Sequence, residues 1–263
     1  MSLVLDERQR AMLQEMGLRL YEPLSHAGGI DDTAPVPPRQ AGGKPAVAAG
    51  GEVGESQPLP RAHPALAPSA PGIELMQWDQ LAQTVAECRA CGLCNGRRNT
   101  VFGTGDRQAD WLIVGEAPGE NEDLQGEPFV GQAGLLLDNM LKALGLNRRE
   151  QVYIANVLKC RPPGNRNPEP SEVAQCEPFL RRQVELLQPR IILAMGRFAV
   201  QALLQSSEPI GKLRGQVHRY NGVPVVVTYH PAYLLRNLPE KAKAWADLCL
   251  ALEVLQQPAA PSR

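Results

Sequence analysis

The chain has 263 residues, with 27 Lys and Arg against 28 Asp and Glu and a formal net charge of −1 at pH 7. This length allows one or two folded domains, and the balanced charge excludes a broadly cationic coat for nucleic acid. The sequence has no uninterrupted run of the ~18 apolar residues that a transmembrane helix needs, and its N-terminus lacks the basic and apolar segments of a signal peptide. We therefore expect a cytoplasmic protein without a membrane partner, whose six cysteines serve metal binding, catalysis or packing rather than disulfides.

The first 72 residues differ in composition from the rest of the chain. Apolar residues at helical spacing predict a short helix at residues 6–21, within an N-terminal arm of residues 1–22. In residues 23–72, 18 of 50 residues are Pro or Gly and no Phe, Trp or Tyr occurs, so we expect a disordered linker. A single folded domain is expected at residues 73–263. The arm either packs loosely on this domain or binds a protein partner.

From residue 73 onward, short apolar runs alternate with segments of helical periodicity. The candidate strands are residues 111–115, 152–158, 191–195 and 223–228. The candidate helices are residues 133–144, 171–187, 197–204 and 239–255. Apolar strands that alternate with helices predict a mostly parallel sheet covered on both faces. Ligands bind such sheets outside the carboxyl ends of the strands, so the residues that follow each strand are the candidate site.

Most of the cysteines form a pattern typical of a metal centre. Four sulfurs come from two separated segments, and these are Cys88, Cys91, Cys160 and Cys176. Such a set suits a tetrahedral zinc ion or a four-cysteine iron–sulfur cluster, and the spacing does not separate the two. Cys94 makes the ligand set ambiguous, because the run ECRACGLC offers three ligands by itself. Cys249 stands alone on the apolar face of a helix and is expected to be a packing residue.

Two loops follow the first candidate strand. The segment GEAPGENED begins at Gly115, and its Gly and Pro residues predict a tight turn that brings backbone N–H groups close to a ligand. Its acidic residues, Glu116 and Glu122 among them, project from that turn or are simply solvated. The segment PFVG holds Phe129 between Pro and Gly. A Phe in such a loop either stacks on a planar ligand or packs in the core.

Polar residues end the second and fourth candidate strands. Asn156 interrupts an apolar run, and its amide offers one acceptor and two donors that match the edge of an imide or amide ligand. His230 lies at the tip of the fourth strand, in the segment HPAYLLRN. Basic residues near the strand ends are candidates for a phosphate-binding rim, although a solvated surface would look the same. These basic residues are Lys159, Arg161, Arg166, Lys212, Arg214, Arg236 and Lys241.

These motifs resemble those of the family 4 uracil-DNA glycosylases, the iron–sulfur branch of that superfamily. The likeness is carried by GEAPGENED, PFVG, ANVLKCRPP with a Cys sixteen positions on, and HPAYLLRN, in this order over roughly residues 80–256. It implies a three-layer α/β/α sandwich with a four-stranded parallel sheet. It also implies a monomeric, monofunctional DNA-repair hydrolase that releases uracil from single- or double-stranded DNA and leaves an abasic site.

The resemblance further implies a cofactor. A structural 4Fe–4S cluster would hold together the chain segments that carry its ligands. The ligands would be Cys88, Cys91, Cys160 and Cys176. Cys94 would then fall outside the ligand set.

The resemblance also implies roles at the base site. The uracil site would be lined by Gly115, Glu116, Ala117, Phe129, Asn156 and His230. Among these, Phe129 would stack on the base, Asn156 would read its polar edge, and His230 would donate to the carbonyl oxygen that gains negative charge. The base must first be flipped out of a duplex, and residues 233–236 are expected to form a loop that wedges into the vacated stack.

The carboxylate that acts near the sugar is left open between two residues. Many other uracil-DNA glycosylases carry an Asp at the position of Ala117, so Glu116 or Glu122 must take that role here. Alternatively, Glu122 crowds the C5 position of the base and so excludes thymine.

Two other functions are considered. The branch of the superfamily that bonds covalently to DNA has Gln at the position of Ala117 and a His-containing, Arg-rich insert, whereas residues 161–170 read RPPGNRNPEP. The second is a non-catalytic iron–sulfur module that binds DNA, which would bind uracil-containing DNA without releasing the base.

Overall fold

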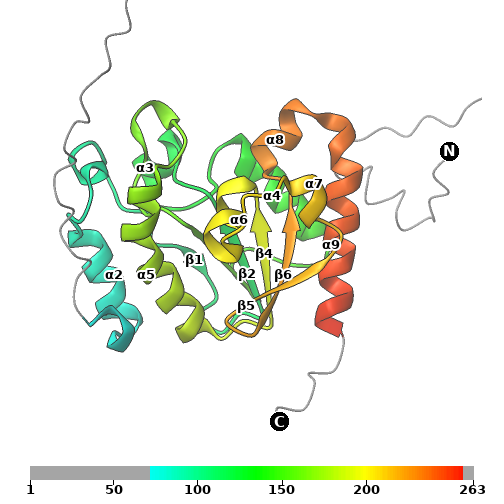
Figure 1. Ribbon diagram of the computed structural model, residues 1–263, viewed down its shortest axis with the longest axis horizontal. Helices are drawn as coiled ribbons and strands as arrows, with labels where there is room; N and C mark the ends of the chain where they lie inside the picture. The colour runs from blue at the N-terminus through cyan, green and yellow to red at the C-terminus, as the bar shows by residue number, and fades with distance from the viewer. Residues whose placement is uncertain (1–71, 257–263) are drawn as a thin grey trace, which may run out of the picture. The chain divides into compact units, whose positions relative to one another are not determined.

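The computed structural model describes residues 72–256 (Figure 1). The expected N-terminal arm, all but the last residue of the expected linker and residues 257–263 lie outside the described residues, and the predictions about them stay predictions. No helix of the described part is long and apolar enough to cross a membrane.

A six-stranded sheet with the order β1-β3-β2-β4-β6-β5 lies at the centre of the described residues (Figure 1). Its four inner strands are parallel, and they are β2 (Trp111–Gly115), β3 (Val152–Asn156), β4 (Ile191–Met195) and β6 (Val223–Thr228). Every residue of β2, β3 and β4 is buried, which is why these strands read as continuous apolar runs. The four expected strands and their parallel arrangement are confirmed, except that the second strand ends at Asn156 rather than at residue 158.

The sheet is wider than expected, because an antiparallel strand extends it at each edge. β1 (Thr104–Gly105) pairs with β3, and β5 (Val217–Tyr220) pairs with β6. The expectation of a four-stranded sheet is therefore corrected to six strands. Both edge strands are short and partly exposed, so neither has the apolar run that marks a buried strand.

Helices cover both faces of the sheet, which confirms three layers. On one face α4 (Gln132–Ala143) and α9 (Lys241–Gln256) pack against the odd-numbered residues of β2, including Trp111 and Ile113. On the other face α5 (Pro170–Leu187) and α6 (Arg197–Leu204) pack against the alternate residues, including Leu112 and Val114. Two apolar cores therefore fix the sheet from opposite sides.

Further short helices complete the described chain. They are α2 (Trp78–Glu87), α3 (Glu120–Gln125), α7 (Ile210–Leu213), α8 (Pro231–Arg236) and the 3₁₀ turns η1 (Ile73–Leu75), η2 (Gly92–Asn95), η3 (Pro163–Asn165) and η4 (Leu238–Glu240). The segment that was expected to be a loop at residues 233–236 is therefore part of a helix. Pro231 occupies the first helical position of α8, where its missing N–H is not needed, so HPAYLLRN starts a helix.

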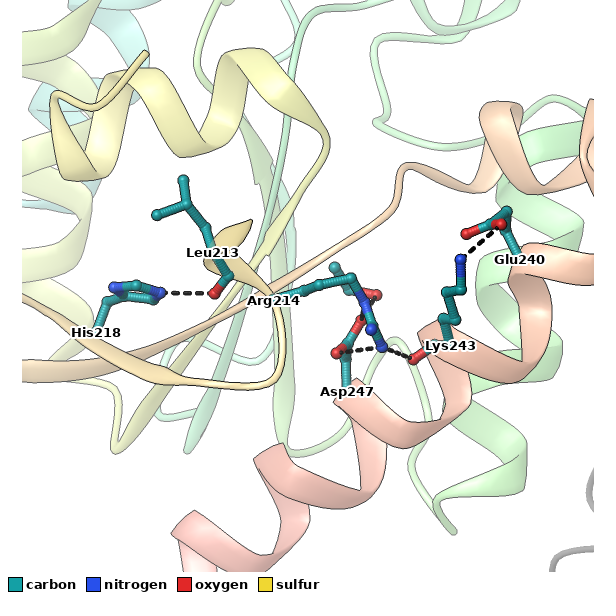
Figure 2. A network of polar contacts seen from close by, with 7 residues as sticks. Leu213, Arg214, His218, Glu240, Lys243 and Asp247 are labelled. Carbon is teal, nitrogen blue, oxygen red and sulfur yellow. Dashed lines mark hydrogen bonds and ion pairs between the residues drawn. The ribbon is translucent and has the colours of Figure 1, made fainter. Parts of the chain in front are cut away.

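The carboxylate of Asp247 joins α9 to β6 through Thr228 and forms an ion pair with Arg214, the residue after α7 (Figure 2). Asp247 is fully buried, and its Oδ2 accepts hydrogen bonds from Thr228 Oγ1 at 3.0 Å and from Arg214 Nε at 3.1 Å. Burial raises the pKa of the Asp247 carboxyl, while Arg214 and Thr228 oppose that rise by stabilising the charged form. Thr228 ends β6 two residues before His230, so the ion pair supports the strand end that carries this histidine.

Loss of this ion pair should destabilise the fold. Asp247→Ala removes the carboxylate partner of the half-buried Arg214 and of the buried Thr228. Removal of one partner from a buried pair costs about 3–5 kcal/mol, and the partial exposure of Arg214 places the loss near the lower end, at about 3 kcal/mol. At about 2–4 °C per kcal/mol for a domain of this size, we expect the melting temperature to fall by about 6–12 °C. Glu208→Ala removes one partner of an exposed pair with Lys212 and is expected to leave the melting temperature nearly unchanged. Thermal melts that show equal small shifts would contradict the role of Asp247.

Candidate functional site

The carboxyl ends of the four parallel strands open into a cavity of about 770 Å³. Residues from all four strand exits line it, and the sequence-predicted residues among them are Glu116, Ala117, Glu122, Phe129, Asn156 and His230. The structure therefore brings together every residue expected at the base site except Gly115, which lies directly behind the wall. This is the edge of the sheet at which ligands of parallel α/β proteins bind.

The register of β2 and β3 sets the floor of the cavity. Gly115 pairs with Asn156, so the two strand ends lie side by side. A Cβ atom at Gly115 would overlap Asn156 Oδ1 and would lie 2.6 Å from Phe129 Cζ. The absence of a side chain at Gly115 thus allows the amide and the aromatic ring to meet at this point.

Phe129 forms one wall and is held by its backbone. It has a positive φ of 56°, which is uncommon for a residue with a side chain. Its carbonyl oxygen accepts a hydrogen bond from Arg148 Nη2 at 2.8 Å, and it lies so close to Gly134 that any Cβ there would overlap it. The ring is 5% exposed and stacks on His230 with 5.3 Å between ring centroids. Phe129 therefore offers a fixed flat surface that is in contact with both core and cavity.

His230 is the N-cap of α8, and this contact defines its free nitrogen. Its Nδ1 accepts the backbone N–H of Ala232 at 3.2 Å, so the proton of the neutral ring lies on Nε2. Burial lowers the pKa of His230 to about 4, with Arg236 adding to the fall and Glu122 opposing it. At neutral pH the ring is uncharged and can donate one hydrogen bond from Nε2.

Asn156 presents a buried acceptor without a partner. The residue is 2% exposed, and its Oδ1 has no hydrogen-bond partner among residues 72–256. A buried amide oxygen without a partner is unfavourable by about 1–3 kcal/mol. A ligand that donates an N–H in the cavity would remove this penalty.

The two candidate carboxylates have different environments. Glu122 Oε1 accepts the backbone N–H groups of Val130 at 2.9 Å and Gly131 at 3.2 Å, and its Oε2 accepts that of Gly119 at 3.1 Å. It therefore ties the loop after β2 to the loop that carries Phe129. No hydrogen bond from the described part of the chain reaches the Glu116 carboxylate. Burial raises the pKa of Glu116 to about 7, and Arg197 partly opposes the rise.

The exit of β4 supplies residues that the sequence motifs missed. Gly196 has a φ of 91°, and a Cβ there would lie 3.0 Å from His230 Cβ, so a glycine is needed for the close approach. Arg197 follows it, starts α6 and lines the cavity. The sequence did mark the position of Arg197, because a Gly follows the buried strand directly in the run MGRF. Tyr229 also lines the cavity and stacks on Tyr233 of α8.

The expected basic rim is only partly present. Of its seven residues, Arg166 and Arg236 line the cavity. Lys159 is 1% exposed and Lys241 is also buried, and Arg214 is engaged by Asp247. These three positions are corrected, because Lys159 and Lys241 lie inside the protein and the guanidinium of Arg214 is paired with Asp247, so none is available to bind phosphate at the surface.

Five cysteines line a second, smaller cavity. They are Cys88, Cys91, Cys94, Cys160 and Cys176. Burial raises the pKa of the thiols of Cys91 and Cys160, and it raises that of Cys176 to about 12. Arg97 Nη1 donates to Cys160 Sγ at 3.2 Å. Buried thiolates at this site would need cationic partners of this kind.

Among residues 72–256, no group of three or more Cys, His, Asp or Glu side chains is arranged to hold a single metal ion. Cys249 lies on α9, away from this cavity, and packs against the apolar core that α9 shares with α4, as expected.

Comparison with known proteins agrees with the site. The uracil DNA glycosylase superfamily matches residues 102–249. A type-4 uracil-DNA glycosylase of Saccharolobus solfataricus is 45% identical over 170 residues, which cover 61% of this chain and 78% of the relative. One of Archaeoglobus fulgidus is 46% identical over 165 residues, or 60% of this chain and 82% of the relative. A type-5 uracil-DNA glycosylase of Pyrobaculum aerophilum is 33% identical over 151 residues, or 51% and 66%.

The resemblance inferred from the four motifs is thereby confirmed. The matched region contains all four parallel strands and the cavity at their carboxyl ends. The chain belongs to the type-4 uracil-DNA glycosylases, enzymes of the uracil-DNA glycosylase superfamily.

Proposed function

We propose that this enzyme is a monofunctional DNA-repair hydrolase that flips uracil out of deaminated DNA, cleaves its N-glycosidic bond and leaves an abasic site. The convergence of Phe129, Asn156 and His230 on one cavity carries this proposal. A flat apolar wall, an unpaired amide oxygen and a neutral imidazole donor together match the face and the polar edge of a pyrimidine. The relatives named type-4 uracil-DNA glycosylases support uracil-containing DNA as the substrate.

Entry of the base requires that it leave the stack. Extrusion of a nucleotide costs a few kcal/mol and is cheapest for a mismatched or single-stranded base. Tyr233 and Leu235 of α8 are 38% and 41% exposed, and Tyr233 lines the cavity mouth. We assign them the wedge that fills the vacated space, because apolar side chains serve in this way in other DNA-bending proteins.

Inside the cavity, the base would stack on Phe129. The unpaired Oδ1 of Asn156 would accept the N3–H of uracil, and the amide nitrogen would donate to O4. Since His230 is neutral with its proton on Nε2, it would donate to O2 without introducing a full positive charge. These contacts distinguish uracil from cytosine, which has no hydrogen on N3.

Cleavage is then a hydrolysis at C1′. The C1′–N1 bond breaks with its electron pair passing to the uracil ring, where charge develops on O2. The hydrogen bond from His230 Nε2 strengthens as that charge grows, so it stabilises the transition state more than the ground state. Water forms the new C1′–O bond, and its proton passes to a carboxylate or to solvent.

We assign the carboxylate near the sugar to Glu116. Both oxygens of Glu122 already accept backbone N–H groups, which makes Glu122 a loop-positioning residue. Glu116 lines the cavity and is not held by such hydrogen bonds. As a carboxylate it would stabilise the positive charge on the sugar or orient the attacking water.

The four-cysteine site is proposed to hold a 4Fe–4S cluster. The donor set fits, because Cys88, Cys91, Cys160 and Cys176 line one cavity and four cysteine thiolates are the usual ligands of such a cluster. The bound cluster would supply a structural cross-link between the segment after α2, the exit of β3 and α5. The site lies beside the loop after β2, since Ala117 packs against the apolar cluster that includes Cys160 and Cys176.

Removal of the imidazole tests the assignment of His230. His230→Ala is expected to lower kcat on uracil-containing oligonucleotides by about 10²–10³-fold, as for loss of one donor to a developing anion. His218→Ala is the matched control. His218 lies in β5, outside the cavity, and its ring contacts the carbonyl oxygen of Leu213 (Figure 2). Base release is measured on single- and double-stranded substrates. Full activity of His230→Ala would overturn its role, and binding without release by the wild type would favour a non-catalytic module.

The ionisation of Glu116 should appear in the pH dependence of activity and stability. If its carboxylate acts at the sugar, kcat/KM rises as pH passes through about 7 in the wild type, and Glu116→Gln is slow without this rise. Because the pKa of Glu116 in the folded state lies above the ordinary 4.5, the free energy of unfolding of the wild type falls as pH rises from about 4.5 to 7, and the lost stability is not regained above pH 7. Glu116→Gln should therefore melt at a higher temperature than the wild type at pH 8, and at a similar one near pH 4.5.

The matched control for that series is Glu122→Gln. It weakens three backbone contacts, so it should lower the melting temperature at pH 8 rather than raise it. If Glu116→Gln keeps the wild-type dependence of kcat/KM on pH, Glu116 is not the carboxylate near the sugar and Glu122 takes that role.

The cluster is tested by metal content. Cys176→Ser should lose iron, sulfide and visible absorbance, whereas Cys94→Ser and Cys249→Ser should keep the wild-type content per chain. Protein prepared anaerobically is analysed for iron, sulfide and zinc. Equal loss in Cys94→Ser would make Cys94 a ligand, and stoichiometric zinc without iron would contradict the cluster.

A further inference from the structure

Lys159 is a buried amine with a fixed set of contacts. Its side chain is 1% exposed, and its Nζ donates to the Asn156 carbonyl oxygen at 2.8 Å and to Gln183 Oε1 at 2.6 Å. Gln183 is fully buried and donates from Nε2 to the Phe102 carbonyl oxygen at 2.9 Å. A buried ammonium is strongly unfavourable unless such acceptors surround it.

These contacts replace a missing piece of the sheet. β1 pairs with β3 through Thr104 and Ile154, and this register would next place Phe102 opposite Asn156. β1 has already ended there. The side chains of Lys159 and Gln183 bridge the gap instead, from the carbonyl of Asn156 to that of Phe102. On the other side of β3, Val157 N–H still donates to the Gly115 carbonyl oxygen at 3.0 Å.

The same residue touches the cysteine site. Lys159 lines the cysteine cavity, and its backbone N–H donates to the Cys176 sulfur. It directly precedes Cys160 and lies three residues after Asn156. One residue therefore holds the carbonyl of the base-reading residue through its side chain and contacts the proposed cluster ligands through its main chain.

We propose that Lys159 is a positioning residue that fixes the end of β3, so that the Asn156 amide faces uracil, and that links this strand end to the cysteine site. The inference rests on the proposed function, in which Asn156 reads the base. Lys159 acts through Asn156 and does not touch the substrate. Its effect should therefore appear in uracil affinity and should vanish when Asn156 has no amide.

The test uses the full-length, cluster-loaded protein and free uracil as the probe. Affinity is measured by NMR titration, independently of turnover, and the iron content and melting temperature of each variant are recorded. Lys159→Met should bind uracil about tenfold more weakly, because the Asn156 carbonyl at the strand end loses its buried hydrogen bond from Nζ. Gln183→Met is the matched control. It also disrupts the buried bridge but leaves the contact from Lys159 to Asn156, so affinity should stay within about twofold.

Two further variants keep the test decisive. The double variant Lys159→Met/Gln183→Met removes the contact between the two side chains together with their hydrogen bonds to the Asn156 and Phe102 carbonyls, so that no buried amide or amine is left unpaired at either position, and it should show the same tenfold loss. In an Asn156→Ala background, Lys159→Met should cause no additional loss, since two residues that act as one unit are not additive.

The outcomes separate the two proposals. Wild-type affinity for uracil in Lys159→Met and in the double variant overturns the positioning role. A further loss of affinity when Lys159→Met is added to Asn156→Ala overturns it as well. If Asn156→Ala alone keeps wild-type affinity, the assignment of Asn156 in the proposed function is overturned. If Asn156→Ala binds weakly while Lys159→Met does not, only the link through Lys159 fails.

Discussion

Parallel pairing of β3, β2, β4 and β6 obliges four segments of the chain to leave the sheet at the same edge. The pairing of Gly115 with Asn156 and of Met195 with Thr228 puts the next residues of each strand beside one another. Glu116 and His230 are separated by more than a hundred residues in sequence, and they line one cavity for this reason. The sheet supplies the geometry, and the exit sequences supply the chemistry.

The cavity is kept open and polar against the tendency of a protein interior to fill it. Glycines at the exits of β2 and β4 remove side chains that would collide with Asn156 and His230. The cost is visible in Glu116, whose carboxyl titrates near 7, and in the unpaired oxygen of Asn156. Both features lower the stability of the empty enzyme, and both are positioned to interact with a substrate. Such local penalties are typical of sites that bind or react.

Local sequence was sufficient for the inner strands, the larger helices and the motif residues around the cavity, but not for Gly196 and Arg197 at the exit of β4. It was insufficient where the decisive contact is long-range. Lys159 and Arg214 look like surface cations in sequence, and only the tertiary structure brings Gln183 and Asp247 to them. The role of Glu122 depends in the same way on loops that meet in space. The edge strands escaped notice because exposed strands lack a continuous apolar pattern.

The aromatic wall of the cavity depends on a neighbour that contributes no side chain. The carbonyl of Phe129 occupies the space where any other residue at position 134 would carry its Cβ, so the ring and the first turn of α4 are locked together. A broader substrate range is therefore hard to reach by enlarging or shifting this wall through single replacements on α4. Evolution or engineering toward bulkier damaged bases would have to rebuild the loop between β2 and α4 as one piece.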